Sequence, residues 1–106
     1  MGKASRAGTE RKLQGFLDMM RQQLPTLRKQ FHVQYLGVFG SYVQGTPRKD
    51  SDLDILVDFT EEPSLFKFIE LEHRLSALLG IKVDLVMKDT LKPVIGRRIL
   101  SEVVGL

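Results

Sequence analysis

Three aspartates and a glycine-serine pair are the residues of this sequence whose types and spacing best suit catalysis or ligand binding. Asp52 and Asp54 stand two apart in an apolar stretch, so on a strand both carboxylates project from one face. Gly40-Ser41 precedes Asp52 by ten residues, and Asp84 interrupts a later apolar run. The set predicts a cation held by carboxylates, beside a turn that binds phosphate.

The carboxylates favour a hard metal ion. Asp84 is expected to be largely buried, where it needs a partner: Arg97 or Arg98, or a metal shared with Asp52 and Asp54. Three neighbouring carboxylates would repel one another, so that one would tend to hold a proton near neutral pH. Magnesium resolves this conflict, and two ions about 3.5–4 Å apart would suit a phosphoryl displacement.

The glycine-serine turn could hold phosphates. Gly40 lets the backbone approach a ligand closely, and the Ser41 hydroxyl can donate to a phosphate oxygen. The turn does not have the Walker pattern, because no Gly-Lys-Ser/Thr follows it. Arg48 in the following loop could neutralise a triphosphate, or it is a simple loop charge.

Composition narrows the class of protein. The chain has 106 residues, enough for one domain, and 42% of them are hydrophobic. It has no cysteine and only two histidines, which excludes disulfides and leaves oxygen as the ligand for any metal. No apolar run is long enough for a membrane span and no signal peptide is evident, so a cytoplasmic protein is expected.

Charge is distributed unevenly along the chain. Residues 50–62 hold six acids and no base, whereas residues 1–30 hold seven Lys or Arg. Those bases are interleaved at helical spacing, which favours solvated helix faces over a nucleic-acid surface.

The elements that must position these groups follow from periodicity. Apolar spacing predicts helices near 10–23 and 25–31, separated at Pro25, after a flexible tail over residues 1–9.

Strands are expected at 33–39, 53–59 and 81–87, with a helix between the last two that is capped by Ser64 and closed by Gly80. A final helix over 93–104 should bury Ile95, Ile99, Leu100 and Val103. The fold class is therefore α/β: one domain, residues 10–106, with helices packed on a three-stranded sheet.

The combined motif resembles that of a known family. Gly40-Ser41, ten residues, Asp52-x-Asp54 and then Asp84 in the next strand resembles the nucleotidyltransferase fold of the DNA polymerase β superfamily. Length and element order are similar to its minimal nucleotidyltransferase (MNT) branch, and the resemblance covers residues 13–106. It implies that Asp52, Asp54 and Asp84 bind the magnesium ions.

The same resemblance implies further roles. Asp84 would also help to deprotonate an acceptor hydroxyl, while Gly40 and Ser41 would hold the β- and γ-phosphates. Family members often carry an arginine just before the second glycine of this region, where the present chain has Gln44. That difference leaves one triphosphate or partner contact open.

The acceptor is expected to come from another molecule, because the chain has no room for an acceptor domain. MNT proteins are similar in context to antitoxins that silence HEPN ribonuclease toxins by adding AMP to a toxin tyrosine. The resemblance therefore implies magnesium-dependent transfer of AMP from ATP to a HEPN toxin. The alternatives are transfer to a small molecule or a nucleic-acid end, and an antitoxin that acts by binding alone. Self-association around the acceptor is also left open.

Overall fold

A single long helix begins the part of the chain that the computed structural model describes, residues 6–106. Helix α1 spans Arg6–Phe31 and buries its apolar stripe, including Leu17, Met20 and Leu27. Two helices separated at Pro25 were predicted, and this is wrong: Pro25 is exposed, so its ring meets solvent while residues on either side pack on the core. Of the predicted tail, residues 6–9 are helical and residues 1–5 lie outside the described part.

The sheet has four strands, one more than predicted. They are β1 (Val33–Phe39), β2 (Leu53–Phe59), β3 (Val83–Met87) and β4 (Val104–Gly105), in the spatial order β3-β2-β1-β4. β2 pairs antiparallel with β1 and parallel with β3, while β4 pairs antiparallel with β1. The α/β class is confirmed, and the sheet is mixed.

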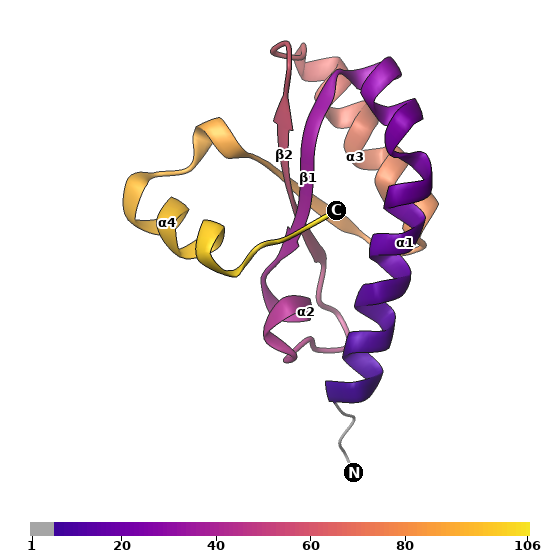
Figure 1. Ribbon diagram of the computed structural model, residues 1–106, viewed down its shortest axis with the longest axis vertical. Helices are drawn as coiled ribbons and strands as arrows, with labels where there is room; N and C mark the ends of the chain where they lie inside the picture. Colours follow the sequence, from indigo (N-terminus) through magenta and orange to yellow (C-terminus); the bar gives the residue numbers. More distant parts are fainter. Residues whose placement is uncertain (1–5) are drawn as a thin grey trace.

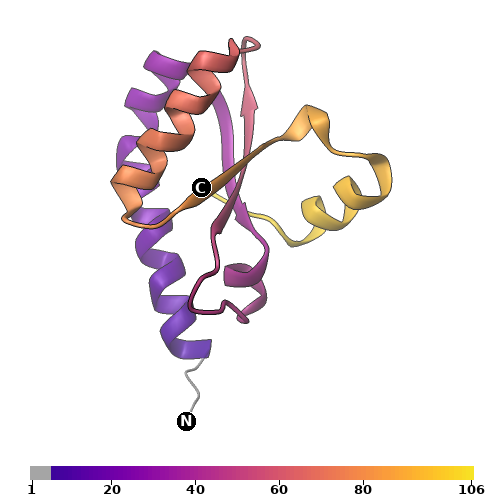
Figure 2. The ribbon, with the colours of Figure 1, turned by 180° about the vertical axis from the view of Figure 1, so that it is seen from behind.

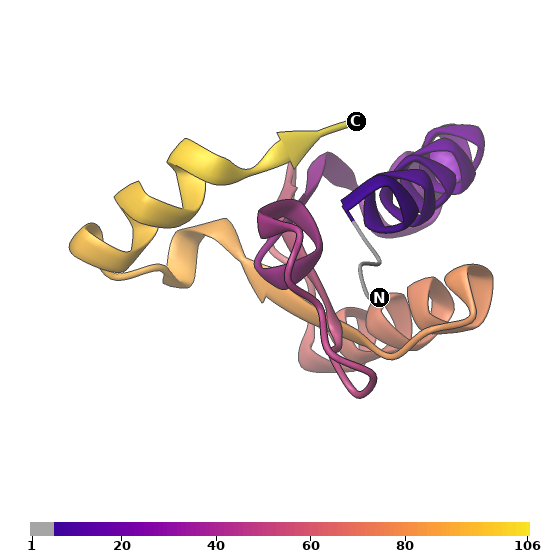
Figure 3. The same ribbon diagram turned by 90° about the horizontal axis from the view of Figure 1, so that it is seen from below.

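Two helices cover one face of this sheet. Helix α3 (Leu65–Leu79) lies beside α1 on the same side, and the core forms between these helices and the strands (Figures 1 and 3). The predicted ends of α3 are confirmed: Ser64 Oγ accepts from the Lys67 N–H at 3.2 Å, and Gly80 closes the helix at φ 69°. Every helix within residues 6–106 falls short of the length or apolarity needed to cross a lipid bilayer.

Side chains of α3 also protect the outer edge of β3. The Val83 N–H donates to Ser76 Oγ at 3.0 Å, and the Leu85 N–H donates to Glu72 Oε2 at 2.9 Å. These bonds occupy N–H groups that another strand would need, so the sheet is blocked from extending along this stretch.

The last helix stands away from the core. Helix α4 (Pro93–Glu102) follows a 3₁₀ turn (Lys88–Thr90) and lies on the side of the sheet opposite α1 and α3 (Figures 2 and 3). Ile95 is 56% exposed and Leu100 is 45% exposed, so the prediction that they face inward is wrong. The helix ends two residues before the predicted boundary because Val104 and Gly105 pair with β1 instead.

Candidate functional site

Two of the three aspartates are direct neighbours. Asp54 on β2 is the register partner of Asp84 on the parallel strand β3. The residues that flank them in sequence, such as Ile55 and Leu85, enter the core beneath α1 and α3. Because successive side chains of a strand point to opposite faces of the sheet, both carboxylates lie on the face away from α1 and α3.

Asp84 differs from its prediction in one respect. It is exposed rather than buried, because it alternates outward between the buried residues Val83 and Leu85. Among the described residues, no ion pair joins Asp84 to Arg97 or Arg98, so the salt-bridge alternative is wrong. Asp84 therefore faces the half-buried Asp54 and solvent.

Burial and like charges act together on Asp54. Burial raises the pKa of this carboxyl, and the negative charges of Asp84, Asp52 and Glu102 raise it further, to about 6. A raised pKa of this origin marks a place where positive charge would be favourable.

Asp52 lies just before β2, next to Lys82. Its Oδ2 stands 4.0 Å from Lys82 Nζ, and both side chains are substantially exposed. Within residues 6–106, no three acidic or histidine side chains are already arranged as a set of metal ligands. The structure thus brings Asp54 and Asp84 together, with Asp52 close enough to affect the pKa of Asp54.

The glycine of the turn lies against the same carboxylate. Phe39, the last residue of β1, is the register partner of Asp54, and this pairing delivers Gly40 to the acidic group. Gly40 adopts φ 82° and ψ −151°, a conformation that disfavours side chains. A Cβ at Gly40 would collide with Asp54 Oδ2 and lie 3.0 Å from its Cγ. The turn and the aspartates therefore form one site.

One helical turn follows the glycine. Helix α2 spans Ser41–Gln44, and Gly45 closes it at φ 79°. The buried Tyr42 packs edge-on against Phe16 of α1, with ring centroids 5.7 Å apart. This contact fixes the turn to the first helix, so Tyr42 has a packing role here.

Glu102 is a residue of the site that sequence reasoning missed. It is the last residue of α4, and its Oε2 accepts from the Gly40 N–H at 2.9 Å. Its Oε1 accepts from Gln44 Nε2 at 3.1 Å. The position of Glu102 depends on the pairing of β4 with β1, and two residues of β4 carry too little sequence signal to predict that pairing.

Arg48 lines a different hollow. The predicted triphosphate ligand lies in the loop before β2, where its backbone N–H donates to Ser51 Oγ at 2.7 Å. It lines a hollow of about 420 Å³ with Lys12, Tyr42 and Lys49. A role of Arg48 in triphosphate binding stays a prediction.

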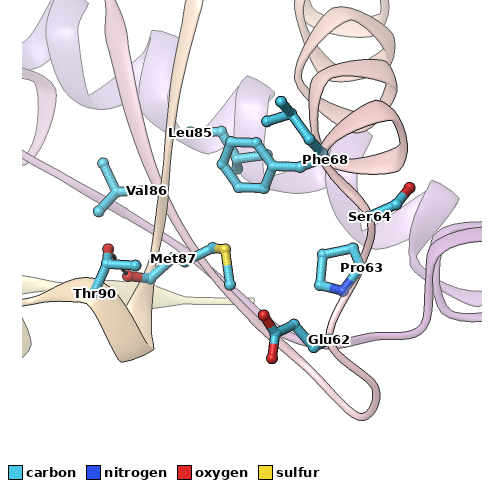
Figure 4. A pocket seen from close by; sticks show the side chains of 9 residues that line it. Glu62, Pro63, Ser64, Phe68, Leu85, Val86, Met87 and Thr90 are labelled. Carbon is cyan, nitrogen blue, oxygen red and sulfur yellow. Dashed lines mark hydrogen bonds between the residues drawn. The ribbon is translucent and has the colours of Figure 1, made fainter.

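Another hollow lies beside the first turn of α3. It measures about 460 Å³ and is bordered by the start of α3 and the end of β3, with Phe68, Leu85 and Met87 among its lining (Figure 4). None of the three aspartates lines it. Its apolar walls do not suit a charged triphosphate, so the acidic site lies outside this hollow.

Comparison with known proteins adds independent findings. Residues 20–105 match the family model of the nucleotidyltransferase domain. The chain is 63% identical over 78 residues to the protein adenylyltransferase MntA of Thermococcus cleftensis, covering 74% of this chain and 79% of the relative.

Solved structures agree with the sequence relatives. The structure of a minimal nucleotidyltransferase is 35% identical, covers 87% of this chain and 94% of its own, and superposes with a TM-score of 0.73. A toxin-antitoxin crystal structure with AMP-PNP is 28% identical, with a TM-score of 0.66 and coverage of 80% and 69%.

Proposed function

This chain belongs to the nucleotidyltransferase domain family, in its minimal branch, and we propose that it is an antitoxin that transfers AMP from ATP to a tyrosine hydroxyl of a partner HEPN toxin. That it is a nucleotidyltransferase follows from the family and from the identity to a protein adenylyltransferase. The observation that carries the rest of the proposal is the position of Asp54, which contacts Gly40 on one side and pairs with Asp84 on the other.

The relatives support the choice of nucleotide and acceptor. One is a protein adenylyltransferase, and one solved toxin-antitoxin structure contains AMP-PNP, an analogue of ATP. ATP as the nucleotide and a toxin as the acceptor therefore suit this chain. The HEPN class and the tyrosine come from the resemblance of the motif to MNT antitoxins.

The acidic group fits magnesium. Asp54 and Asp84 offer only oxygen ligands, and like charges already oppose the ionised form of Asp54. Magnesium commonly uses one or two carboxylates together with substrate phosphates and water, so this pair suffices as a protein contribution. Asp52 would become a third ligand after leaving Lys82, and the three carboxylates would then hold two ions. Bound magnesium would supply positive charge to the phosphates and carboxylates.

The remaining groups would position the reactants. Gly40 and Ser41 would hold the β- and γ-phosphates, since the turn lies against the carboxylates and offers a hydroxyl donor. The tyrosine oxygen would then form a bond to the α-phosphorus while the bond to pyrophosphate breaks. Asp84 would accept the tyrosine proton. Because Asp84 is exposed, a residue of another protein can reach it.

Transfer of label to a toxin tests the proposal. The chain is incubated with a HEPN toxin, magnesium and ATP labelled at the α-phosphate, and the toxin is analysed by intact mass and tandem mass spectrometry. We expect AMP on a toxin tyrosine, and loss of this product in Asp54→Asn and Asp84→Asn. Asp58→Asn is the matched control, because Asp58 lies farther along β2 and accepts from its neighbour, the Phe59 N–H, at 3.1 Å.

The outcomes separate the alternatives. Label on a nucleic-acid end or a small molecule, with none on the toxin, would replace the proposed acceptor. Neutralisation of the toxin by Asp54→Asn as efficiently as by the wild type would indicate an antitoxin that acts by binding alone.

A further inference from the structure

The carboxylate of Glu102 spans the glycine-serine turn from end to end. It accepts from the N–H of Gly40, the residue before helix α2, and from the side chain of Gln44, the last residue of α2. We propose that Glu102 is a positioning residue that holds Gly40 and Ser41 in the shape that binds the nucleotide phosphates. This inference rests on the proposed function. We call Glu102 with its two donors, Gly40 and Gln44, the carboxylate clamp.

Both sides of Glu102 are anchored. Glu102 is the last residue of α4, and the Val103 N–H closes that helix by donating to the Ile99 oxygen at 2.9 Å. After it, Val104 and Gly105 pair with Val38 and Gly37 of β1, and the Leu106 N–H donates to the Leu36 oxygen at 3.1 Å. The carboxyl end of the chain is therefore tied to the strand that leads into Gly40.

Close packing makes this anchor specific. A Cβ at Gly37 would lie 2.7 Å from both Tyr35 Oη and Val103 Cγ2, and one at Gly105 would lie 3.0 Å from Tyr35 Oη. A side chain at either glycine would therefore displace Tyr35, and one at Gly37 would also displace Val103. The glycines thus let β4 pack closely on β1, and this pairing brings Glu102 to the turn.

The clamp acts on a backbone that needs support. Gly40 has a left-handed φ of 82°, and hydrogen bonds to an ionised carboxylate are stronger than those between neutral groups. Holding the two ends of a four-residue helix leaves little freedom for Ser41, which lies between them. An ordered Ser41 lowers the entropy lost when phosphates bind.

A competing function for Glu102 makes the opposite prediction. Its carboxylate occupies an N–H group at a turn where phosphates are expected, so it could compete with the nucleotide. Removal of a competitor would strengthen nucleotide binding, whereas removal of a clamp would weaken it. Binding measurements therefore distinguish the two directly.

The clamp also explains the residue at position 44. The Gln44 amide donates to Glu102, so this position contacts the carboxylate of the last residue of α4. Arginine at position 44 would turn a neutral donor into a charged one. Gln44→Arg should therefore tighten the clamp, provided that Glu102 is present.

The test measures ATP analogue binding and Gly40 amide exchange in the same proteins. We expect Glu102→Ala to weaken binding of AMP-PNP with Mg²⁺ by about tenfold, and Glu102→Gln by about threefold, since glutamine keeps one acceptor. Amide hydrogen exchange of Gly40, followed by NMR, should accelerate about tenfold in Glu102→Ala. Ser101→Ala is the control, because Ser101 Oγ donates to the Arg98 oxygen of its own helix, at 2.7 Å.

Each result decides the matter. Unchanged or tighter binding in Glu102→Ala, with Ser101→Ala as reference, would overturn the proposal. If Glu102→Ala does not fold, the other two variants decide. Weaker binding of AMP-PNP by Glu102→Gln, together with equal or tighter binding by Gln44→Arg, would support the clamp. If the wild type transfers no AMP and binds no AMP-PNP, the proposed function fails, while faster Gly40 exchange in Glu102→Gln still supports the clamp.

Discussion

The backbone of Gly40 lies directly against the carboxylate of Asp54, with no space for a side chain between them. A Cβ at Gly40 would meet the Asp54 carboxylate, and the left-handed φ of 82° would disfavour it further. The predicted phosphate turn and the predicted metal ligand are thus parts of one surface, connected by the pairing of β1 with β2.

Gly40→Ala should therefore impair both stability and transfer. We expect it to lower the free energy of unfolding by about 1–3 kcal/mol, through strain at positive φ. AMP transfer should fall by about 100-fold or more, because displacement of Asp54 misplaces the reacting groups. Denaturant titration and the toxin-labelling assay measure the two effects.

Gly80→Ala introduces a side chain at positive φ without a collision. Gly80 also has a positive φ, 69°, but its ψ of 24° lies in the left-handed helical region, whereas ψ at Gly40 is −151°. A Cβ at Gly80 would meet nothing within 4 Å. We expect a loss of about 1 kcal/mol of stability, with transfer unchanged. Equal loss of transfer in both variants would show that contact with Asp54 is not the reason that position 40 requires glycine.

Much of this arrangement is predictable from local sequence. Alternation in 53–59 identifies β2, and Ser64 with Gly80 marks the ends of α3, because caps and periodicity are local signals. The resemblance of the spacing between Gly40 and Asp52 to a family motif correctly predicts a nucleotidyltransferase.

The wrong predictions concern residues whose structure depends on contacts between distant parts of the chain. Pro25 ordinarily ends a helix, but packing on both sides keeps α1 continuous. Apolar Ile95 and Leu100 suggest a buried face that the sheet does not cover. Glu102 enters the site only through β4, whose two residues have no periodicity.

The raised pKa of Asp54 predicts a dependence of stability on pH in metal-free protein. The pKa is about 6 in the folded state against an ordinary value of 3.8, so the folded state binds the proton more tightly. The contribution to stability is fully present below about pH 4 and is lost as pH rises through 6. Because Asp54 is only half-buried and solvent screens its charge, we expect about 1 kcal/mol.

Asp54→Asn removes this titration. Denaturant unfolding in EDTA from pH 4 to pH 7.5 should show a difference between wild type and variant that favours the variant increasingly toward pH 7.5. A difference that does not vary with pH would contradict the assignment of the raised pKa to Asp54.

Magnesium should stabilise the protein through the same carboxylates. At ten times its dissociation constant, a ligand of the folded state adds about 1.4 kcal/mol to the free energy of unfolding. We expect this gain at pH 7.5 in the wild type and in Asp58→Asn, and its loss in Asp54→Asn and Asp84→Asn. Thermal unfolding with magnesium and with EDTA measures it, and equal gains in all four proteins would place magnesium elsewhere.

Replacement of Pro25 should stabilise α1. Proline has no N–H, so position 25 cannot donate to the Arg21 carbonyl, and its ring crowds the preceding turn. Because Pro25 is exposed, alanine there restores the bond without disturbing the core. After subtraction of the entropy that proline removes from the unfolded chain, we expect a gain of about 2 kcal/mol in denaturant titration.

Pro93→Ala is the control, since Pro93 occupies the first position of α4, where no intrahelical bond is lost, and its effect should stay within about 1 kcal/mol. A destabilised Pro25→Ala would mean that α1 depends on the proline to set its path over the sheet.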